Sequence, residues 1–204
     1  MASIANTFFE VKNSNITNNA MQNIAGTFQA SSRPDICAAG FLCVKASLLP
    51  CSGYTGINNG NQWVFNAATN GQPGSDGIAQ EIYAFNSYDV NTVTGNTGNM
   101  WRIGAETAGL ELPAGEMGTF TKIIPGEIYR FGSGNFSTTP TSLPGYKYVT
   151  IANGLLVASN SAPAAGTGLV FQIIGTAAEN YTVGTWNGGT CYRLLAQYAA
   201  PVGA

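Results

Sequence analysis

Residues 146–159 read YKYVTIANGLLVAS, with Asn153 and Gly154 between two runs of apolar and β-branched residues. Such runs are typical of strands. Asn and Gly both tolerate the positive φ that a type I′ turn requires at its two central positions. The stretch therefore predicts two antiparallel strands, 146–152 and 155–159, joined by a two-residue turn.

The chain from residue 39 onward has the same character. Short runs rich in β-branched and aromatic residues alternate with clusters of Gly, Pro, Asn and Ser, which is typical of strands separated by turns. The further strands predicted in this way are 40–49, 62–67, 80–88, 100–104, 118–124, 127–131, 168–174, 181–186 and 190–198. A second hairpin is expected at 186–190, WNGGT. We therefore expect a mostly-β protein, an antiparallel β-sandwich or barrel with hairpins.

The first 35 residues differ from this pattern and predict a polar N-terminal arm. They are rich in Asn, and the segment SSRP at 31–34 separates them from the strands. Four apolar residues have the spacing of a short helix, namely Ile16, Ala20, Met21 and Ile24. Residues 1–35 could lie across a neighbour or across the chain's own sheet, or form an independent element. We predict that roughly Ala2 to Gln29 contacts a neighbouring subunit instead of completing its own core.

The remaining residues, 36–204, are expected to form the all-β region. The segment LPAGE at 112–116 recurs in shortened form as PGE at 125–127, and each would place a Pro-led turn ahead of a strand. Two such echoes are too few to define a repeat. They leave two organisations open, a single domain or two sub-domains with a boundary near residue 110.

Charged residues are scarce, at 9% of the chain, against roughly 25% in an ordinary soluble domain. The net charge is −2, and no two basic residues are adjacent. Nucleic acids and anionic membranes are both bound through clustered cations, so we expect neither as a partner. The basic residues are Lys12, Arg33, Lys45, Arg102, Lys122, Arg130, Lys147 and Arg193.

The chain has no histidine. That absence excludes Ser-His-Asp and Cys-His catalysis, His-ligated metals and the usual general base near neutral pH. Three glutamates, Glu106, Glu111 and Glu116, recur at steps of five, a spacing that suits neither a helix face nor a strand face. A glycosidase needs two carboxyl groups across one sugar bond, but we expect solvated loop acids here. We predict no catalytic residue, no cofactor and no metal ion.

Two oxygen-rich segments and three tryptophans have a functional and a structural interpretation. Residues 58–61 (NNGN) and 75–77 (SDG) lack the alternating acids of a calcium loop, so we expect turns. Trp63, Trp101 and Trp186 could stack on a sugar, but aromatic residues on strands more often fill a core, which is the expectation here.

The four cysteines, Cys37, Cys43, Cys51 and Cys191, do not have the spacing of paired zinc knuckles. Cys43 lies inside the apolar run GFLCV, where a buried thiol is expected. We expect all four to be buried thiols. The alternative is a disulfide among Cys37, Cys51 and Cys191.

Taken together, the chain resembles the small accessory proteins of tailed bacteriophage virions, in particular those that decorate or cement the capsid. The resemblance rests on an Asn-, Gly-, Thr- and Ala-rich composition and on the polar stretch from Ile4 to Gln29. It also rests on the closing segments KYVTIANGLLVASNSAPAAGTGLVFQIIG (147–175) and GTCYRLLAQY (189–198).

The resemblance implies a non-enzymatic protein of the virion, made in the host cytoplasm without a signal peptide. Its implied partners are the major capsid protein or other virion proteins, and it would be a homo-oligomer, often a trimer. No catalytic residue is implied. Two alternatives remain open, a carbohydrate-binding, lectin-like β-sandwich on a phage or bacterial surface, and a hydrolase that uses two carboxylates.

Overall fold

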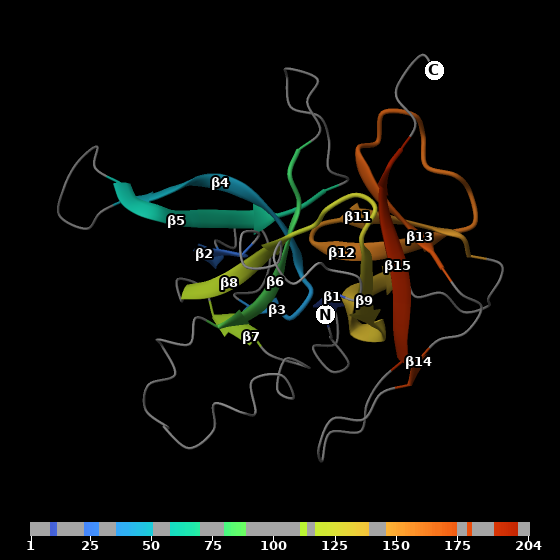
Figure 1. Ribbon diagram of the computed structural model, residues 1–204, viewed down its shortest axis with the longest axis horizontal. Helices are drawn as coiled ribbons and strands as arrows, with labels where there is room; N and C mark the ends of the chain where they lie inside the picture. Colours follow the sequence, from blue (N-terminus) through green and yellow to red (C-terminus); the bar gives the residue numbers. More distant parts are fainter. Residues whose placement is uncertain are drawn as a thin grey trace.

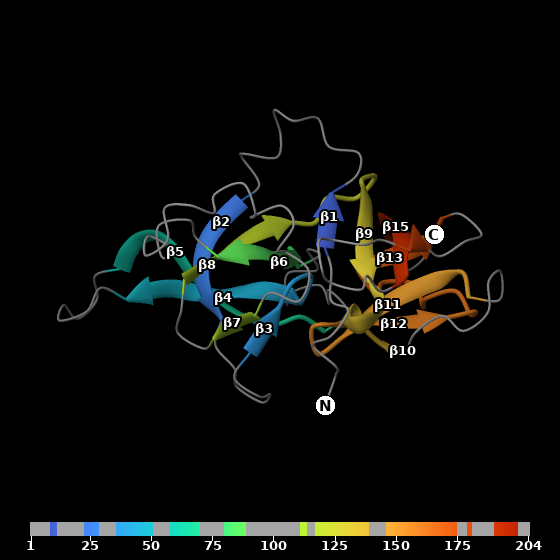
Figure 2. The ribbon, with the colours of Figure 1, turned by 90° about the horizontal axis from the view of Figure 1, so that it is seen from below.

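The computed structural model confirms the mostly-β class. Its strands form a closed barrel, an eight-stranded sheet and a two-stranded ribbon made of β3 (Ile36–Ala38) and β7 (Glu111–Pro113). In Figures 1 and 2 the barrel lies on one side of the molecule and the large sheet on the other. The structure describes residues 9–11, 23–28, 36–50, 58–69, 80–88, 111–113, 117–138, 146–174, 179–180 and 190–199.

The barrel strands follow in the order β2-β5-β4-β6-β8, and β8 pairs with β2 to close the ring. Only the β2–β5 pair is parallel among the five pairs of this barrel. The bounds are β2 (Asn23–Phe28), β4 (Leu42–Pro50), β5 (Asn58–Ala67), β6 (Tyr83–Tyr88) and β8 (Met117–Lys122).

Aromatic rings fill the interior of the barrel. The rings of Phe65 and Phe120 stack with their centroids 4.0 Å apart, and the Tyr83 ring meets Phe65 edge-on at 5.4 Å. A small barrel has just enough room inside for such side chains. At Gly26 of β2, a Cβ atom would overlap the Phe65 ring and the Trp63 carbonyl oxygen. Glycine therefore lets β2 approach β5 and close the ring.

The large sheet has the order β1-β9-β15-β13-β11-β12-β10, with β14 paired to β15. A short 3₁₀ turn, η3 (Ser133–Asn135), precedes β10. The bounds are β1 (Phe9–Val11), β9 (Ile128–Gly132), β10 (Phe136–Thr138), β11 (Tyr148–Ala152), β12 (Leu155–Ser159), β13 (Leu169–Ile173), β14 (Glu179–Asn180) and β15 (Thr190–Tyr198).

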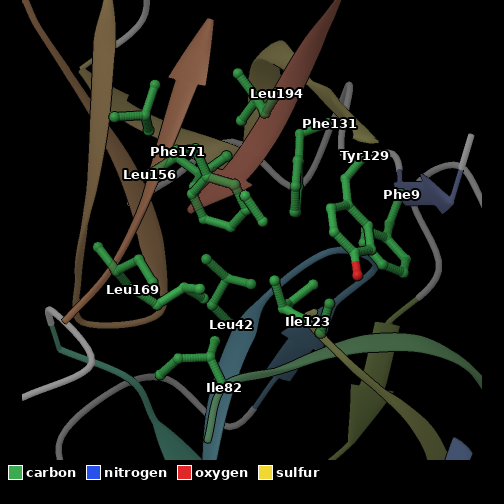
Figure 3. Packing of buried hydrophobic residues seen from close by; sticks show 14 of the residues in the cluster. Phe9, Leu42, Ile82, Ile123, Tyr129, Phe131, Leu156, Leu169, Phe171 and Leu194 are labelled. Atoms are coloured by element: carbon green, nitrogen blue, oxygen red, sulfur yellow. The ribbon is translucent and has the colours of Figure 1, made fainter. Parts of the chain in front are cut away.

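One face of the large sheet packs against the outside of the barrel. Leu42 and Ile82, from the barrel side, belong to the same buried cluster as Phe171 and Leu194 of the sheet, and Figure 3 shows these side chains converging. The buried Asn135 adds a polar link, because its Nδ2 donates to the Ala39 carbonyl at 2.6 Å. The two sheets therefore share one core.

The turn of the β11–β12 hairpin is inserted into this junction. Asn153 and Gly154 have φ of 49° and 77°, so the hairpin predicted at 146–159 is confirmed. The Gly154 N–H donates to the Ala68 carbonyl at 2.7 Å, and the Gly154 carbonyl accepts from the Leu42 N–H at 2.9 Å. A Cβ atom on Gly154 would overlap the Phe41 ring. The turn thus ties the large sheet to the barrel by backbone hydrogen bonds.

The expectation that the N-terminal segment contacts a neighbour instead of completing its own core is wrong for β1 and β2. Phe9 of β1 is buried against the rings of Tyr129 and Phe131, and Phe28 of β2 lies inside the barrel. Ile24, expected in a short helix, lies in β2. The strands take these residues because their apolar side chains complete the chain's own core. The rest of the expected helix lies outside the described residues.

Along the sequence, the last barrel strand ends at Lys122 and the next strand, which belongs to the large sheet, begins at Ile128. β1, which precedes all the barrel strands, also belongs to the large sheet. The strands expected at 155–159 and 190–198 are confirmed with the same bounds, and most of the others within a few residues. The strands expected at 100–104 and 181–186, and the turn of the WNGGT hairpin, lie outside the described residues.

Replacing Gly154 with alanine tests the junction. Gly126 is the matched control, because it also has positive φ, 91°, but no atom lies within 4 Å of the added Cβ. Backbone strain alone should cost Gly126→Ala about 1–2 kcal/mol of unfolding free energy. Gly154→Ala should cost about 1–3 kcal/mol more, because the methyl group also displaces the Phe41 ring. Urea unfolding measures both. Equal losses would show that Gly154 is needed only for its φ.

Candidate functional site

Charged and aromatic side chains gather at one end of the barrel. Cys43 and Phe120 belong to the buried cluster inside the barrel. Lys45 and Lys122 come two positions after them in β4 and β8, and each therefore lies on the same side of its strand as the interior residue. Lys122 is the last residue of β8 and pairs with Tyr83, the first residue of β6. We call the group Lys45, Trp63, Glu81, Tyr83 and Lys122 the barrel-end cluster.

Glu81 is the centre of the cluster. Lys122 Nζ donates to Glu81 Oε1, the Tyr83 hydroxyl donates to Oε2 at 2.6 Å, and Lys45 Nζ lies 3.7 Å from Oε2. The hydrogen bonds from Lys122 and Tyr83 lower the pKa of Glu81 below its usual value, against the opposing effect of partial burial. Glu81 is therefore a fixed negative charge, and it is poorly suited to act as a general acid near neutral pH.

Tyr83 supports this charge from inside the barrel. Its ring is 1% exposed, and burial, followed by the hydrogen bond to Glu81, raises the pKa of its hydroxyl far above the usual value of 10. The hydroxyl therefore stays protonated and acts as a hydrogen-bond donor. A buried tyrosine usually finds a hydrogen-bond partner for its hydroxyl, and here that partner is Glu81.

Lys45 lies over two aromatic rings. Its Nζ is 4.8 Å from the centroid of Trp63 and 4.8 Å from that of Tyr83. An ammonium group is attracted to the negative face of an aromatic ring within about 6 Å. These contacts fix the Lys45 ammonium and place it over a Trp63 face that a sugar ring would need for stacking.

The structure does not test the pairs among Glu106, Glu111 and Glu116, because it describes only one of these three residues. Glu111 lies in β7, where it pairs with Ala38, and Glu106 and Glu116 lie outside the described residues. Residues 58–61 begin β5 and are not a turn, so that expectation is wrong. Asn58 pairs with Pro50 at the end of β4, and this pairing makes β5 longer than its Asn-rich start predicts.

The tryptophans and the segment 75–77 are the remaining candidates, and the structure describes only part of them. Trp63 is half-buried against the barrel interior, as expected for a core residue. Trp101, Trp186 and the segment 75–77 lie outside the described residues. In the part of the chain that the structure describes, no three His, Cys, Asp or Glu side chains gather where they could hold a metal ion.

Two cysteines are located. Cys43 is buried in the barrel, where its Sγ donates to the Phe41 carbonyl at 3.8 Å, and Cys191 is buried in β15. Neither forms a disulfide, so Cys191 is no longer a partner in the disulfide alternative. The side chain of Cys37 and all of Cys51 lie outside the described residues.

Reasoning from the sequence missed the barrel-end cluster. Glu81 and Lys122 are 41 residues apart, so no local spacing indicates that they meet. The one available signal was the pair Glu81 and Tyr83, two residues apart at the start of a predicted strand and therefore on one face. Their partners become apparent only when β6 pairs with β8.

Replacing Glu81 with glutamine tests the electrostatic role of the cluster. Because the folded-state pKa of Glu81 is lowered, its contribution to stability is full above the unfolded-state value near 4.5 and is lost as the pH falls through the folded value. Half of the side chain is exposed, so the loss should be below about 1 kcal/mol. Unfolding free energies at pH 7 and pH 3 should differ less in Glu81→Gln than in the wild type. Equal differences would contradict the role.

Comparison with known proteins identifies no relative. No family model matches the chain, and neither a curated protein nor a solved structure matches it. Within the described ranges, no helix has the length and hydropathy needed to cross a membrane. The function proposed next rests on the composition and geometry of this chain alone.

Proposed function

We propose that the chain is a non-enzymatic structural protein that binds a repeating protein surface, as a capsid-decorating protein of a phage virion does. The observation that carries this proposal is the outer face of the large sheet. A row of neutral residues crosses five paired strands on that face. The row, which we call the neutral row, consists of Ile128, Leu195, Gln172, Tyr148 and Ser159.

The neutral row faces away from the barrel. The residues beside it in sequence, among them Tyr129, Leu194 and Phe171, belong to the core, and side chains alternate along a strand. Gln172 is exposed and the other four members are half-buried. The next row on one side is also neutral and includes Gln197, Thr150 and Val170, of which Val170 is buried. On the other side, Arg130 and Arg193 are neighbours across β9 and β15.

A broad neutral face of this kind suits contact by shape and hydrogen bonding. The compositional signature of a protein interface is the depletion of charge at its centre, with aromatic residues enriched there. The chain is only 9% charged, so long-range steering by its own field is weak. A weak contact of this type becomes strong when it is repeated across a lattice or within an oligomer.

The described candidates for the two alternatives are engaged within the chain or isolated. The carbohydrate-binding alternative needs an accessible aromatic platform, but Lys45 lies over the Trp63 ring, and the exposed Tyr198 makes no ring contact among the described residues. The hydrolase alternative needs two convergent carboxyl groups, and Glu81 has its two oxygens engaged by Lys122 and Tyr83. We therefore propose the lattice-binding function alone.

Cofractionation with virus-like particles tests the proposal. A tagged copy of the chain should be expressed in a bacterium that carries its gene, and particles released from that strain should be separated on a density gradient. We expect the chain to sediment with the particles, and electron microscopy to show added density on the shell. A chain that stays at the top of the gradient in every preparation would contradict the proposal.

A charge in the neutral row refines this test. Gln172→Glu puts a carboxylate at an exposed position of the row, and Ala165→Glu puts one at an exposed position of the turn between β12 and β13. Burying an uncompensated charge should reduce the particle-bound amount on the order of tenfold for Gln172→Glu. Ala165→Glu should bind as the wild type does. Equal binding by the two variants would remove the neutral row as the contact surface.

A further inference from the structure

The barrel-end cluster has hydrogen-bond donors in excess of its acceptors. An ammonium group carries three N–H donors. Lys122 uses one of them on Glu81, and Lys45 Nζ is 3.7 Å from Glu81 Oε2, which is beyond hydrogen-bond distance. The side chains of Lys45 and Lys122 are 25% and 37% exposed, so their remaining donors reach water.

Each oxygen of Glu81 already accepts one hydrogen bond. Oε1 accepts from Lys122, and Oε2 accepts from Tyr83 and lies beside Lys45. A second cation arriving here would be repelled by two ammonium groups that already compete for the one carboxylate. The group that completes the cluster is therefore an acceptor with negative charge.

The net charge of the cluster indicates which anion it suits. Two lysines and one glutamate leave a single positive charge, in a chain whose own net charge is −2. A carboxylate carries one negative charge and neutralises the cluster, whereas a phosphate dianion would leave it with a net negative charge. Binding of nucleic acid draws on many cations, but the other described basic residues, Arg130, Arg193 and Lys147, belong to the large sheet.

We propose that the barrel-end cluster binds a carboxylate of the protein on which the chain docks, an aspartate or glutamate side chain in an acidic segment. The ion pair with Glu81 and the two rings hold the lysines in place before the partner arrives, so little side-chain entropy is lost on binding. This inference rests on the proposed lattice-binding function for the identity of the partner, but the anion site itself can be tested separately.

A short acidic peptide is the probe for the site. Hexaglutamate, hexaglutamine and inorganic phosphate are titrated separately into the ¹⁵N-labelled full chain. The amide signals of Lys45, Glu81 and Lys122 and the indole N–H of Trp63 are followed by NMR. We expect saturable shifts of these signals with hexaglutamate only, and smaller shifts at high salt, because the contact is partly exposed.

Substitutions connect the shifts to the cluster. Lys122→Gln and Lys45→Gln should each weaken hexaglutamate binding about two- to fivefold, as expected for a partly exposed ion pair. Lys147→Gln is the control, since Lys147 is exposed and lies just before β11 of the large sheet. It should bind hexaglutamate as the wild type does. Thermal melts confirm that each variant is folded.

Three results would overturn the inference: no shift with hexaglutamate, shifts with phosphate in its place, or equal binding by Lys122→Gln and Lys147→Gln. Each is distinguishable from failure of the lattice-binding proposal, which shows in the particle gradient. If the wild-type chain sediments with particles but does not bind hexaglutamate, the carboxylate site is ruled out and the lattice-binding function is still supported.

Discussion

The Asn153–Gly154 turn holds the large sheet against the barrel. The turn donates to Ala68, accepts from Leu42 and leaves no room for a side chain beside the Phe41 ring. Leu155, the next residue, is buried in the barrel cluster, while Leu156 is buried in the core shared with the large sheet. One hairpin therefore contributes to both cores.

This arrangement fixes two surfaces relative to each other. The neutral row lies on the outer face of the sheet, away from the barrel, and the barrel-end cluster lies where β6 begins and β8 ends. For the proposed lattice binding, specificity would come from holding a neutral, shape-based contact and one charged contact at a fixed distance. The shared core supplies that rigidity.

Local signals predicted the local parts of the fold. The Asn-Gly turn, the strand 155–159 and the strand 190–198 follow from backbone sterics and β-branched residues, and all three are present. What depends on distant pairing was not predictable. The parallel β2–β5 pair and the burial of Phe9 require partners far along the chain. The barrel-end cluster was missed for the same reason. The Asn-rich start of β5 becomes a strand by pairing with the end of β4.

Native-state hydrogen exchange tests most directly whether the barrel and the sheet form one unit. The amides of Phe120 in β8 and Leu194 in β15 lie in different sheets and at buried positions. If the hairpin joins the two cores, both amides should exchange only by global unfolding, with the same free energy and the same dependence on denaturant. A barrel amide that exchanges through its own, smaller opening would contradict the account, because the two surfaces would then not be held together.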